Sequence, residues 1–554
     1  MTISRTLLLA AAVLATTGRV TAQESSSQSR IPQVEQINRL VQQGWADYEL
    51  TPSTPATESE WCRRVFLDVL GRVPSVNELK EFLNSKSVNK RDDLVNMLLE
   101  DEKYTEEYAR NWTTIWTNIL IGRSGGTERN TLTSREGMQK YLRDTFARNK
   151  PYNKMVFELV TATGSSSPGS DNFNGAVNFL VMKVNEEKAT LATSETSKIF
   201  MGLQVQCTQC HNHPFNEWKQ QKFWEMNAIF RQTRALRTFV PGTRDVASAE
   251  LVNEDFAGEG LNPEEAEVFY ELRNGEVRSA MPRFVDGTDI EPSGYIEDVV
   301  RRNELGKLML QSEYIDRMLV NRYWAHFLGY GFTKPIDDMG PHNPPSHPEL
   351  LDYLSTEIRK NSYNLKDLIR WITLSEAYSL SSRVTAGNKS DDPLLGELPK
   401  FTHFYLRQMQ AEELYESLIV ATQAQKTRGS YEEQEKSKTQ WLQQFVQAFG
   451  TDEGQEATTF NGTIPQALMM MNGDLIKRAT GTDKGSFLGQ IADSPLKPAQ
   501  KIDYLFMAGL GRSATNAEVT VANKLLLARK GDQAAALQDM WWAVLNSNEF
   551  IMNH

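Results

Sequence analysis

The chain is poor in the residues that most often carry chemistry. Its 554 residues include only three cysteines and seven histidines. A disulfide framework is therefore excluded as the main source of stability, and the length is sufficient for hydrophobic cores in two to four domains. Because cysteine and histidine are scarce, a stretch in which both occur together is unlikely to be accidental and carries most of the functional information.

Excess positive charge and long apolar runs are also lacking. The formal net charge is −11, and an acidic surface argues against nucleic acid as a partner, because phosphate neutralisation dominates such binding. Beyond the first residues, no stretch approaches the roughly 20 apolar residues of a membrane-spanning helix. Serine-elbow, P-loop and Rossmann patterns do not occur, which disfavours acyl-serine hydrolysis, nucleotide hydrolysis and NAD chemistry.

The beginning of the chain has the pattern of a secretory signal. Arg5 precedes the apolar stretch Leu7–Ala15, and small residues lead to Ala22. This pattern predicts a signal peptide over residues 1–22, followed by a polar tether over 23–31. We therefore expect an exported protein in the periplasm or at the cell surface, without a transmembrane segment after cleavage.

Apolar periodicity predicts a mainly α, multidomain helical protein. The helical spacing is clearest over Val65–Leu70 and over 313–328, where Gly329 ends the pattern. Two short strands around Asn274-Gly275 predict a β-hairpin. The expected division is an N-terminal helical domain over 32–239, a β-rich insert over 240–295 and a C-terminal helical domain over 296–554.

One phrase occurs near both ends of the predicted helical region. Each copy begins with a Leu-Gly-Arg triplet. A serine or threonine follows three residues after the arginine, and a glutamate follows six residues after it. The two copies are Leu70–Arg72 with Ser75 and Glu78, and Leu510–Arg512 with Thr515 and Glu518. A glycine stop followed by a capping box predicts a helix, a turn and a second helix. The sequence therefore predicts related helical units near the two ends.

The stretch from Val205 to Phe215 is the main functional signal. Cys207-x-x-Cys210-His211 is the attachment pattern of a c-type haem, in which two thiols bind the haem covalently and the histidine is an axial iron ligand. Two other interpretations remain open: a tight disulfide, or a non-haem metal site completed by His211, His213 or distant histidines. The remaining thiol, Cys62, is expected to be a small buried core residue.

A second histidine cluster follows the helix predicted over 313–328. Its members share a helix face or a proline-rich loop, and they are our candidates for substrate contact if the protein is an enzyme: Arg322, His326, Asp337, Asp338 and His347. Ser346 is equally well explained as a helix cap with Glu349.

These histidines are also candidate metal ligands. A sixth haem ligand would come from His326, His347 or a methionine such as Met226, or that position would stay open. Zinc or non-haem iron would instead take Cys207, Cys210, His211 and one further histidine.

Four long phrases resemble one known family: Gly202–Phe215, Leu319–Gly331, Asn343–Asp352 and Leu545–His554. They are similar to a large set of exported planctomycete proteins that pair two domains of unknown function, the first labelled a planctomycete cytochrome domain. The resemblance covers the chain from about residue 33 to the C-terminus. Its phrases include six residues that we carry over as candidates: Cys207, Cys210, His211, His213, His326 and His347. The family has no settled activity, so the resemblance implies no substrate.

The resemblance also exposes two differences. Many members carry an additional N-terminal cytochrome-c-like domain, which implies electron transfer for the group, and we expect no such domain in this chain. Members often have further cysteines shortly before the segment that is Pro465–Leu468 here, whereas Gly454–Phe460 contains none.

The main expectation is an exported c-type haem protein with a role in electron transfer or an extracellular redox step, acting with an unidentified redox or surface-protein partner. One alternative is an exported non-haem metal-dependent hydrolase or carbohydrate-processing protein. A second alternative is a non-catalytic assembly module in which Cys207 and Cys210 form a structural disulfide.

Overall fold

A computed structural model describes residues 31–185, 187–427, 430–450 and 463–554. Helices make up most of it and the sheets are small, which confirms the mainly α prediction. The predicted signal peptide, most of the predicted tether and the segment Gly454–Phe460 lie outside the described residues. Within the described ranges, no helix is both long enough and apolar enough to cross a membrane.

The N-terminal region is a series of amphipathic helices with defined caps. The Thr57 side chain accepts a hydrogen bond from Glu60 N at the start of α2, and Gly71, at φ 72°, ends that helix in the left-handed conformation. The helices are α1 (Pro32–Asp47), α2 (Glu58–Leu70), α3 (Val76–Asn84), α4 (Lys90–Glu100), α5 (Glu102–Ile121), α6 (Arg135–Ala147) and α7 (Tyr152–Thr161).

The central region mixes two helices with short strands. A three-stranded antiparallel sheet has the order β1-β3-β2, and β4 pairs with β5 in a hairpin that confirms the turn at Asn274-Gly275. The elements are β1 (Gly164–Ser165), η1 (Gly175–Phe179), η2 (Glu187–Ala189), α8 (Thr190–Met201), η3 (Gln206–Gln209), α9 (Gln220–Phe230), β2 (Thr233–Phe239), β3 (Val246–Asn253), η4 (Pro263–Glu265), β4 (Val268–Glu271) and β5 (Val277–Ala280).

After residue 300, the described residues are mainly helical and include one short strand pair. Strands β6 and β7 bring the last residues beside Arg407–Gln408. The elements are α10 (Arg301–Gln311), α11 (Tyr314–Leu328), α12 (Pro348–Lys360), α13 (Leu365–Thr373), α14 (Glu376–Ser379), η5 (Pro393–Leu395), β6 (Arg407–Gln408), α15 (Ala411–Thr422), η6 (Ala424–Thr427), α16 (Tyr431–Phe449), α17 (Ile464–Asn472), α18 (Asp474–Ala479), α19 (Phe487–Asp493), α20 (Pro498–Leu510), α21 (Asn516–Ala528), α22 (Gln533–Leu545), α23 (Asn548–Ile551) and β7 (Met552–Asn553).

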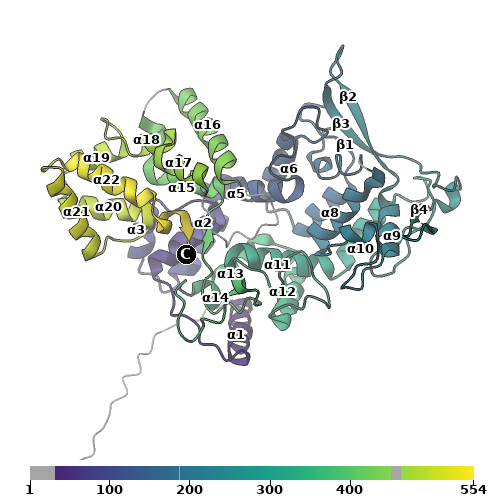
Figure 1. Cartoon of the computed structure of the whole chain (residues 1–554), viewed down its shortest axis with the longest axis horizontal. Helices are drawn as coiled ribbons and strands as arrows, with labels where there is room; N and C mark the ends of the chain where they lie inside the picture. The colour runs from purple at the N-terminus through teal and green to yellow at the C-terminus, as the bar shows by residue number, and fades with distance from the viewer. Residues whose placement is uncertain (1–30, 186, 428–429, 451–462) are drawn as a thin grey trace, which may run out of the picture.

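The β-rich region starts earlier in the chain than residue 240, where the sequence placed it. Strand β2 begins at Thr233, directly after α9, and β1 at Gly164 joins the same sheet from within the predicted N-terminal helical domain. The β2–β3 ribbon projects from the lobe that contains α6 and α8–α10 (Figure 1). All residues of β2 after Thr233 are at least partly exposed, so the strand lacks the buried–exposed alternation that marks a half-buried strand in a sequence.

Two adjacent buried arginines attach this region to the helices. Arg301 donates to the carbonyls of Ala228, Ala266, Pro292 and Ser293. Arg302 donates to the carbonyls of residues 160 and 162 at the end of α7 and to a side-chain oxygen at the end of β3. Burial lowers the pKa of Arg301 to about 10 and that of Arg302 to about 9. Guanidinium groups suit this role because they offer five fixed donors.

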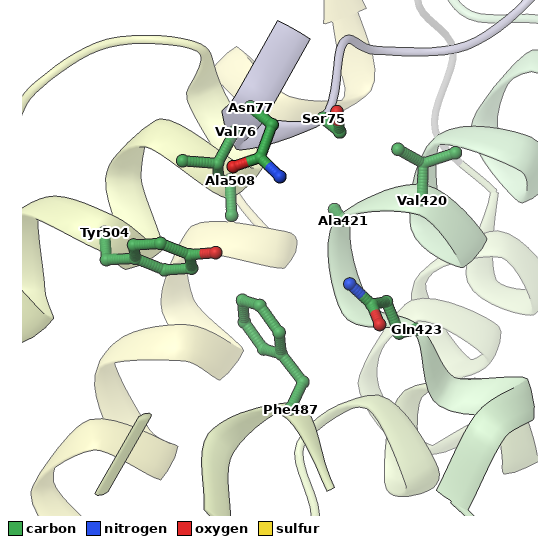
Figure 2. A pocket seen from close by; sticks show the side chains of 9 residues that line it. All are labelled: Ser75, Val76, Asn77, Val420, Ala421, Gln423, Phe487, Tyr504 and Ala508. Carbon is green, nitrogen blue, oxygen red and sulfur yellow. The ribbon is translucent and has the colours of Figure 1, made fainter. Parts of the chain in front are cut away.

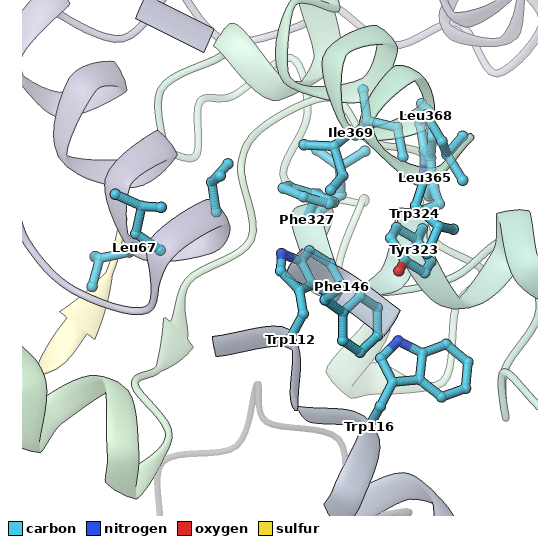
Figure 3. Close-up of a cluster of buried hydrophobic side chains, with 14 of the residues drawn as sticks. Leu67, Trp112, Trp116, Phe146, Tyr323, Trp324, Phe327, Leu365, Leu368 and Ile369 are labelled. Carbon is cyan, nitrogen blue, oxygen red and sulfur yellow. The ribbon is translucent and has the colours of Figure 1, made fainter. Parts of the chain in front are cut away.

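A single cluster of buried apolar side chains extends from Val34 to Ile551 and includes both predicted helical regions. At its centre Trp112 of α5 stacks on Tyr323 of α11, with ring centroids 4.8 Å apart and planes within 4°. Figure 3 shows these rings together with Phe146 and Phe327. Cys62 is fully buried in the same cluster, as predicted from its sequence context.

The repeated phrase forms the same local structure at both ends. Ser75 with Glu78 and Thr515 with Glu518 each make a complete capping box. In each unit the arginine after the glycine bonds both oxygens of that glutamate, and its Nε bonds a second glutamate, Glu107 in the first unit and Glu549 in the second. The predicted relation between the two ends is therefore present in the fold.

The two units lie side by side, with α3 of the first against α20 of the second (Figure 1). Figure 2 shows the small cavity between them, where Tyr504 and Phe487 face Val76 and Asn77. Its volume is about 60 Å³. A space of this size holds only a few water molecules, so this cavity does not serve as a substrate site.

Candidate functional site

The cysteine motif follows a helix that ends at a tightly packed glycine. Helix α8 stops at Gly202, whose φ is 69° and whose carbonyl accepts a hydrogen bond from Met339 N at 2.7 Å. A Cβ on Gly202 would lie 2.9 Å from the Met339 sulfur and 3.0 Å from that of Met318. The chain entering the motif is therefore fixed against the loop that follows α11.

The motif itself forms the short 3₁₀ turn η3 and the loop after it. Thr208 is buried and its hydroxyl donates to the Val205 carbonyl at 2.5 Å. The Trp224 indole and the Gln220 amide of α9 both donate to the Gln209 carbonyl. These contacts hold the turn while the side chains of Cys207 and Cys210 remain exposed free thiols.

The environment of Cys207 disfavours its thiolate. Partial burial raises its pKa, and the negative charge of Asp338 raises it further. Reactive cysteines of thiol–disulfide enzymes show the opposite shift, because a helix N-terminus or a neighbouring cation stabilises the thiolate.

The rings of His211 and His213 have opposite hydrogen-bonding roles. His211 Nδ1 lies 2.7 Å from the Asn212 carbonyl, which can only accept, so this nitrogen carries the proton. In the neutral ring the lone pair is then on Nε2. His213 Nδ1 instead faces the backbone N–H groups of Phe215 and Asn216 at 3.2 and 3.1 Å, so it accepts and Nε2 carries the proton.

The two aspartates predicted in the second cluster lie close to the motif. Asp337 accepts a hydrogen bond from Gln204 Nε2 at 2.6 Å and so holds the chain just before the turn. Asp338 accepts from His342 Nε2 at 2.9 Å. The His342 ring is 6.5 Å from that of His213, centroid to centroid. The loop after α11 therefore provides one side of the candidate site.

His342 was not among the predicted site residues. Its position in the proline-rich loop, four residues after Asp338, was the available signal. His347, in the same loop, was the predicted residue.

Arg322 and His326 share a face of α11 as predicted, but their contacts are structural. Arg322 donates to the Ile199 carbonyl at 3.3 Å and supports α8 rather than the motif. His326 Nε2 donates to the Asp68 carbonyl at 3.1 Å, and its ring lies 5.1 Å from Trp112. Burial lowers the pKa of His326, which keeps it neutral.

His347 is in the core, at the start of α12. Its ring is 5% exposed and lies among Tyr48, Phe332 and Phe401. His347 itself is the N-cap residue of α12, and its side chain makes no capping hydrogen bond. The predicted cap, Ser346, is therefore wrong: its hydroxyl lies 3.0 Å from His347 Nδ1 instead. Met226 is likewise buried, within α9.

Within the described ranges, no three His, Cys, Asp or Glu side chains lie close enough together to hold a metal ion. The motif supplies two exposed thiols and one imidazole nitrogen with a lone pair. This donor set matches the covalent and axial contacts of a c-type haem, for which a compact cluster of metal ligands is not required.

Comparisons with known proteins give two matches and two negative results. Residues 36–235 match the family model PSCyt2, described as a protein of unknown function (DUF1549). Residues 301–526 match the family model PSD1, described as a protein of unknown function (DUF1553). No curated protein and no solved structure matches the chain. The cysteine motif falls within the first match, which ends at residue 235, and the loop with Asp338 and His342 falls within the second.

Proposed function

The chain belongs to the proteins that join these two domains of unknown function in this order, and we propose its function from the arrangement of its own residues, because the family descriptions name no activity. The protein is exported and carries one c-type haem, bound through Cys207 and Cys210 with His211 as an axial ligand. Its role is electron transfer or a redox step outside the cytoplasm.

The observation that carries this proposal is the orientation of the His211 ring. An axial histidine binds iron through one nitrogen while the other donates to a carbonyl or carboxylate, which fixes the ring and its tautomer. The hydrogen bond from His211 Nδ1 to the Asn212 carbonyl provides that support. His213 has the reverse arrangement and does not suit this role.

The exposed side chains of the motif support covalent attachment of haem at the protein surface. Both thiols are exposed, and the neighbouring Phe215 side chain is 87% exposed. A bound haem would supply one-electron redox chemistry at this position. Phe215 offers an apolar surface beside it, and the turn held by Thr208 and Trp224 keeps the two attachment points in place.

The rival functions receive less support from the same contacts. A thiol–disulfide oxidoreductase would need a stabilised thiolate, whereas the pKa of Cys207 is raised. A non-haem metal site would need a fourth ligand besides Cys207, Cys210 and His211. His213 could bind a metal ion through Nδ1 only by losing its two backbone hydrogen bonds, and through Nε2 only by changing its tautomer.

The first experiment is a visible spectrum of the protein produced with its own export signal in a host that matures c-type cytochromes. We expect a Soret band, sharp α and β bands after dithionite reduction, and a mass increase of roughly 0.6 kDa from covalent haem. Cys207→Ala should abolish covalent attachment. Cys62→Ala is the matched control, because this thiol is fully buried away from the motif, and it should leave the spectrum unchanged.

Substitutions at His211 and His213 test which of the two histidines is the axial ligand of the iron. His211→Ala should retain the added mass but shift the Soret, α and β bands, because the iron loses its axial histidine, whereas His213→Gln should retain both the mass and the bands. A colourless protein from a host that matures a control cytochrome would refute the haem proposal. Metal analysis and thiol counting on that sample would then decide between a metal site and a disulfide.

A further inference from the structure

Strand β2 is the open edge of the three-stranded sheet. The sheet has the order β1-β3-β2, so β2 pairs with β3 on one side and, within the described residues, with no strand on the other. The ribbon that β2 and β3 form projects from its lobe (Figure 1). An edge strand presents a row of unpaired backbone N–H and C=O groups, and another extended chain can pair with them.

Hydrogen bonds on the far side of β3 show which backbone groups of β2 are free. Ser166 N donates to the Ala249 carbonyl at 2.8 Å, and Ala249 N donates to the Ser166 hydroxyl at 3.1 Å. The backbone groups of Ala249 therefore face away from β2. Arg237 lies opposite Ala249 in the register, and the two residues of such a pair direct their backbone groups away from each other. The N–H and C=O groups of Arg237, and those of Ala235 two residues earlier, therefore point to the open edge.

The backbone along this edge is not interrupted by a bulge. The register shift of the ribbon lies between Thr238 and Phe239, where β3 contributes one extra residue, Ala247. A bulge in an edge strand is one of the devices that prevent pairing with another chain. Here the extra residue belongs to the central strand, so β2 keeps the regular extended backbone that a further strand needs.

Exposed apolar side chains and unpaired arginines lie along the same edge. Leu236 is 44% exposed and Phe239 is 49% exposed. Arg237 lies between them, and Arg244 lies in the turn of the ribbon; both are exposed, and neither forms an ion pair in the part of the chain that the structure describes. The other arginine of the strand, Arg234, already has a carboxylate partner. The edge therefore offers apolar contacts together with the positive charge of two arginines.

We propose that the open edge of β2 binds an extended, acidic segment of a partner protein, which adds a fourth strand to the sheet. The backbone groups of Ala235 and Arg237 pair with the main chain of the segment, and this pairing supplies the affinity. Carboxylates of the segment pair with Arg237 and Arg244, and its apolar residues contact Leu236 and Phe239, which together select the partner. None of these residues belongs to the cysteine motif, so the proposal holds whether or not the motif carries haem.

A second copy of the chain matches this edge less well than an acidic segment. Antiparallel pairing of two β2 edges would bring a second Arg237 to the same edge, and like charges on paired strands are destabilising. The partner that the charges favour is therefore a different protein with acidic side chains.

The test is fluorescence polarisation of labelled peptides with the full-length exported protein at low ionic strength, where charge screening is weak. The probe is a synthetic peptide of about ten residues, a usual strand length, in which glutamate alternates with valine and threonine. Two peptides serve as controls: one has lysine in place of glutamate, and the other keeps the side chains but carries a methyl group on every backbone nitrogen. We expect the glutamate peptide to bind and both controls to bind at least about tenfold more weakly.

Two variants of the protein test the backbone and the charge separately. Ala235→Pro removes an N–H from the open edge and leaves the bonds to β3, and it should weaken binding of the glutamate peptide about tenfold. Arg237→Glu should weaken binding of that peptide at least about tenfold and strengthen binding of the lysine peptide. Arg148→Glu is the matched control, because its ion pair with Asp144 is on the exposed end of α6, and binding should not change.

Three outcomes would overturn the proposal. If the glutamate peptide does not bind, Arg237 only protects the edge from pairing. If the lysine or methylated peptide binds as well as the glutamate peptide, or if Ala235→Pro and Arg237→Glu bind it like the wild type, the contact is not strand addition at this edge. If the wild type self-associates in sedimentation and both variants do not, the edge belongs to a second copy. Because the Arg237 side chain is exposed, Arg237→Glu is expected to fold even where Ala235→Pro destabilises the ribbon.

Discussion

Protonation of His347 should make the protein sensitive to mild acid. Burial lowers the pKa of this ring from 6.5 to about 4, and the distant negative charge of Asp391 opposes the shift only in part. A Cβ on Gly44 would lie 2.4 Å from His347 Nε2, and aromatic rings surround the other faces. The folded state therefore has little room for a water molecule or counter-charge beside the protonated ring.

The sign and size of the effect follow from proton linkage. The unfolded chain binds a proton at His347 below pH 6.5, whereas the folded protein binds one only near pH 4, so stability is complete above pH 6.5 and falls as the pH decreases towards 4. Between pH 7.5 and pH 5 this residue should reduce the free energy of unfolding by about 2 kcal/mol.

The assay is urea unfolding followed by tryptophan fluorescence at the two pH values. His347→Phe stays neutral at both, so its loss of stability between pH 7.5 and pH 5 should be smaller than that of the wild type by about 2 kcal/mol. Phe401→Leu is the control, because this ring lies 5.4 Å from His347 and its replacement perturbs packing without removing the titrating group. Equal pH-dependent losses in the wild type and His347→Phe would refute the reasoning.

Three further predictions concern the framework. Glu78→Gln should lower the free energy of unfolding by about 2–3 kcal/mol, because the Glu78 side chain is only 10% exposed. The equivalent Glu518→Gln should lower it by less than about 1 kcal/mol, because the Glu518 side chain is 30% exposed and water screens its ion pair. Similar urea midpoints for the two variants would contradict this. Asp68→Asn should cost about 3–5 kcal/mol in thermal or urea unfolding, since it removes the buried carboxylate charge that pairs with Arg407 and accepts hydrogen bonds from Tyr378 and Asn553, and leaves only Glu413 beside Arg407; an unchanged transition would count against it. Gly71→Ala should cost at least about 1 kcal/mol, since φ is 72° and the new Cβ would lie 2.4 Å from Asn111 Oδ1; a fully stable variant would exclude this strain.

Local features of the fold could be predicted where a few neighbouring residues decide the structure. The capping boxes at Ser75 and Thr515 and the turn at Asn274-Gly275 formed as expected. Each depends on hydrogen bonds or φ values within about six residues, so its energy is set locally. The start of the β-rich region was placed too late, because the exposed ribbon of β2 lacks the apolar alternation that marks a half-buried strand.

The candidate site was predictable in part. The motif at Cys207 is contiguous in sequence, whereas only the fold brings Asp337 and Asp338 beside it. His326 and His347 looked equivalent to these residues in sequence, yet His347 is buried in the core and His326 is half-buried against Trp112, while His342 lies at the site. A histidine in a polar loop carries no local mark of whether its ring will point into the core or towards a ligand.

The sequence by itself determined the helical class, the repeated helix–turn units, the scarcity of thiols and the spacing of Cys207, Cys210 and His211. These properties depend on composition or on neighbours along the chain. Only the tertiary structure decided that Asp337 holds Gln204 just before the motif and that Arg302 joins the end of α7 to the end of β3. Both depend on groups from different segments meeting at hydrogen-bonding distance, and that is fixed by packing of the whole chain rather than by any one stretch of it.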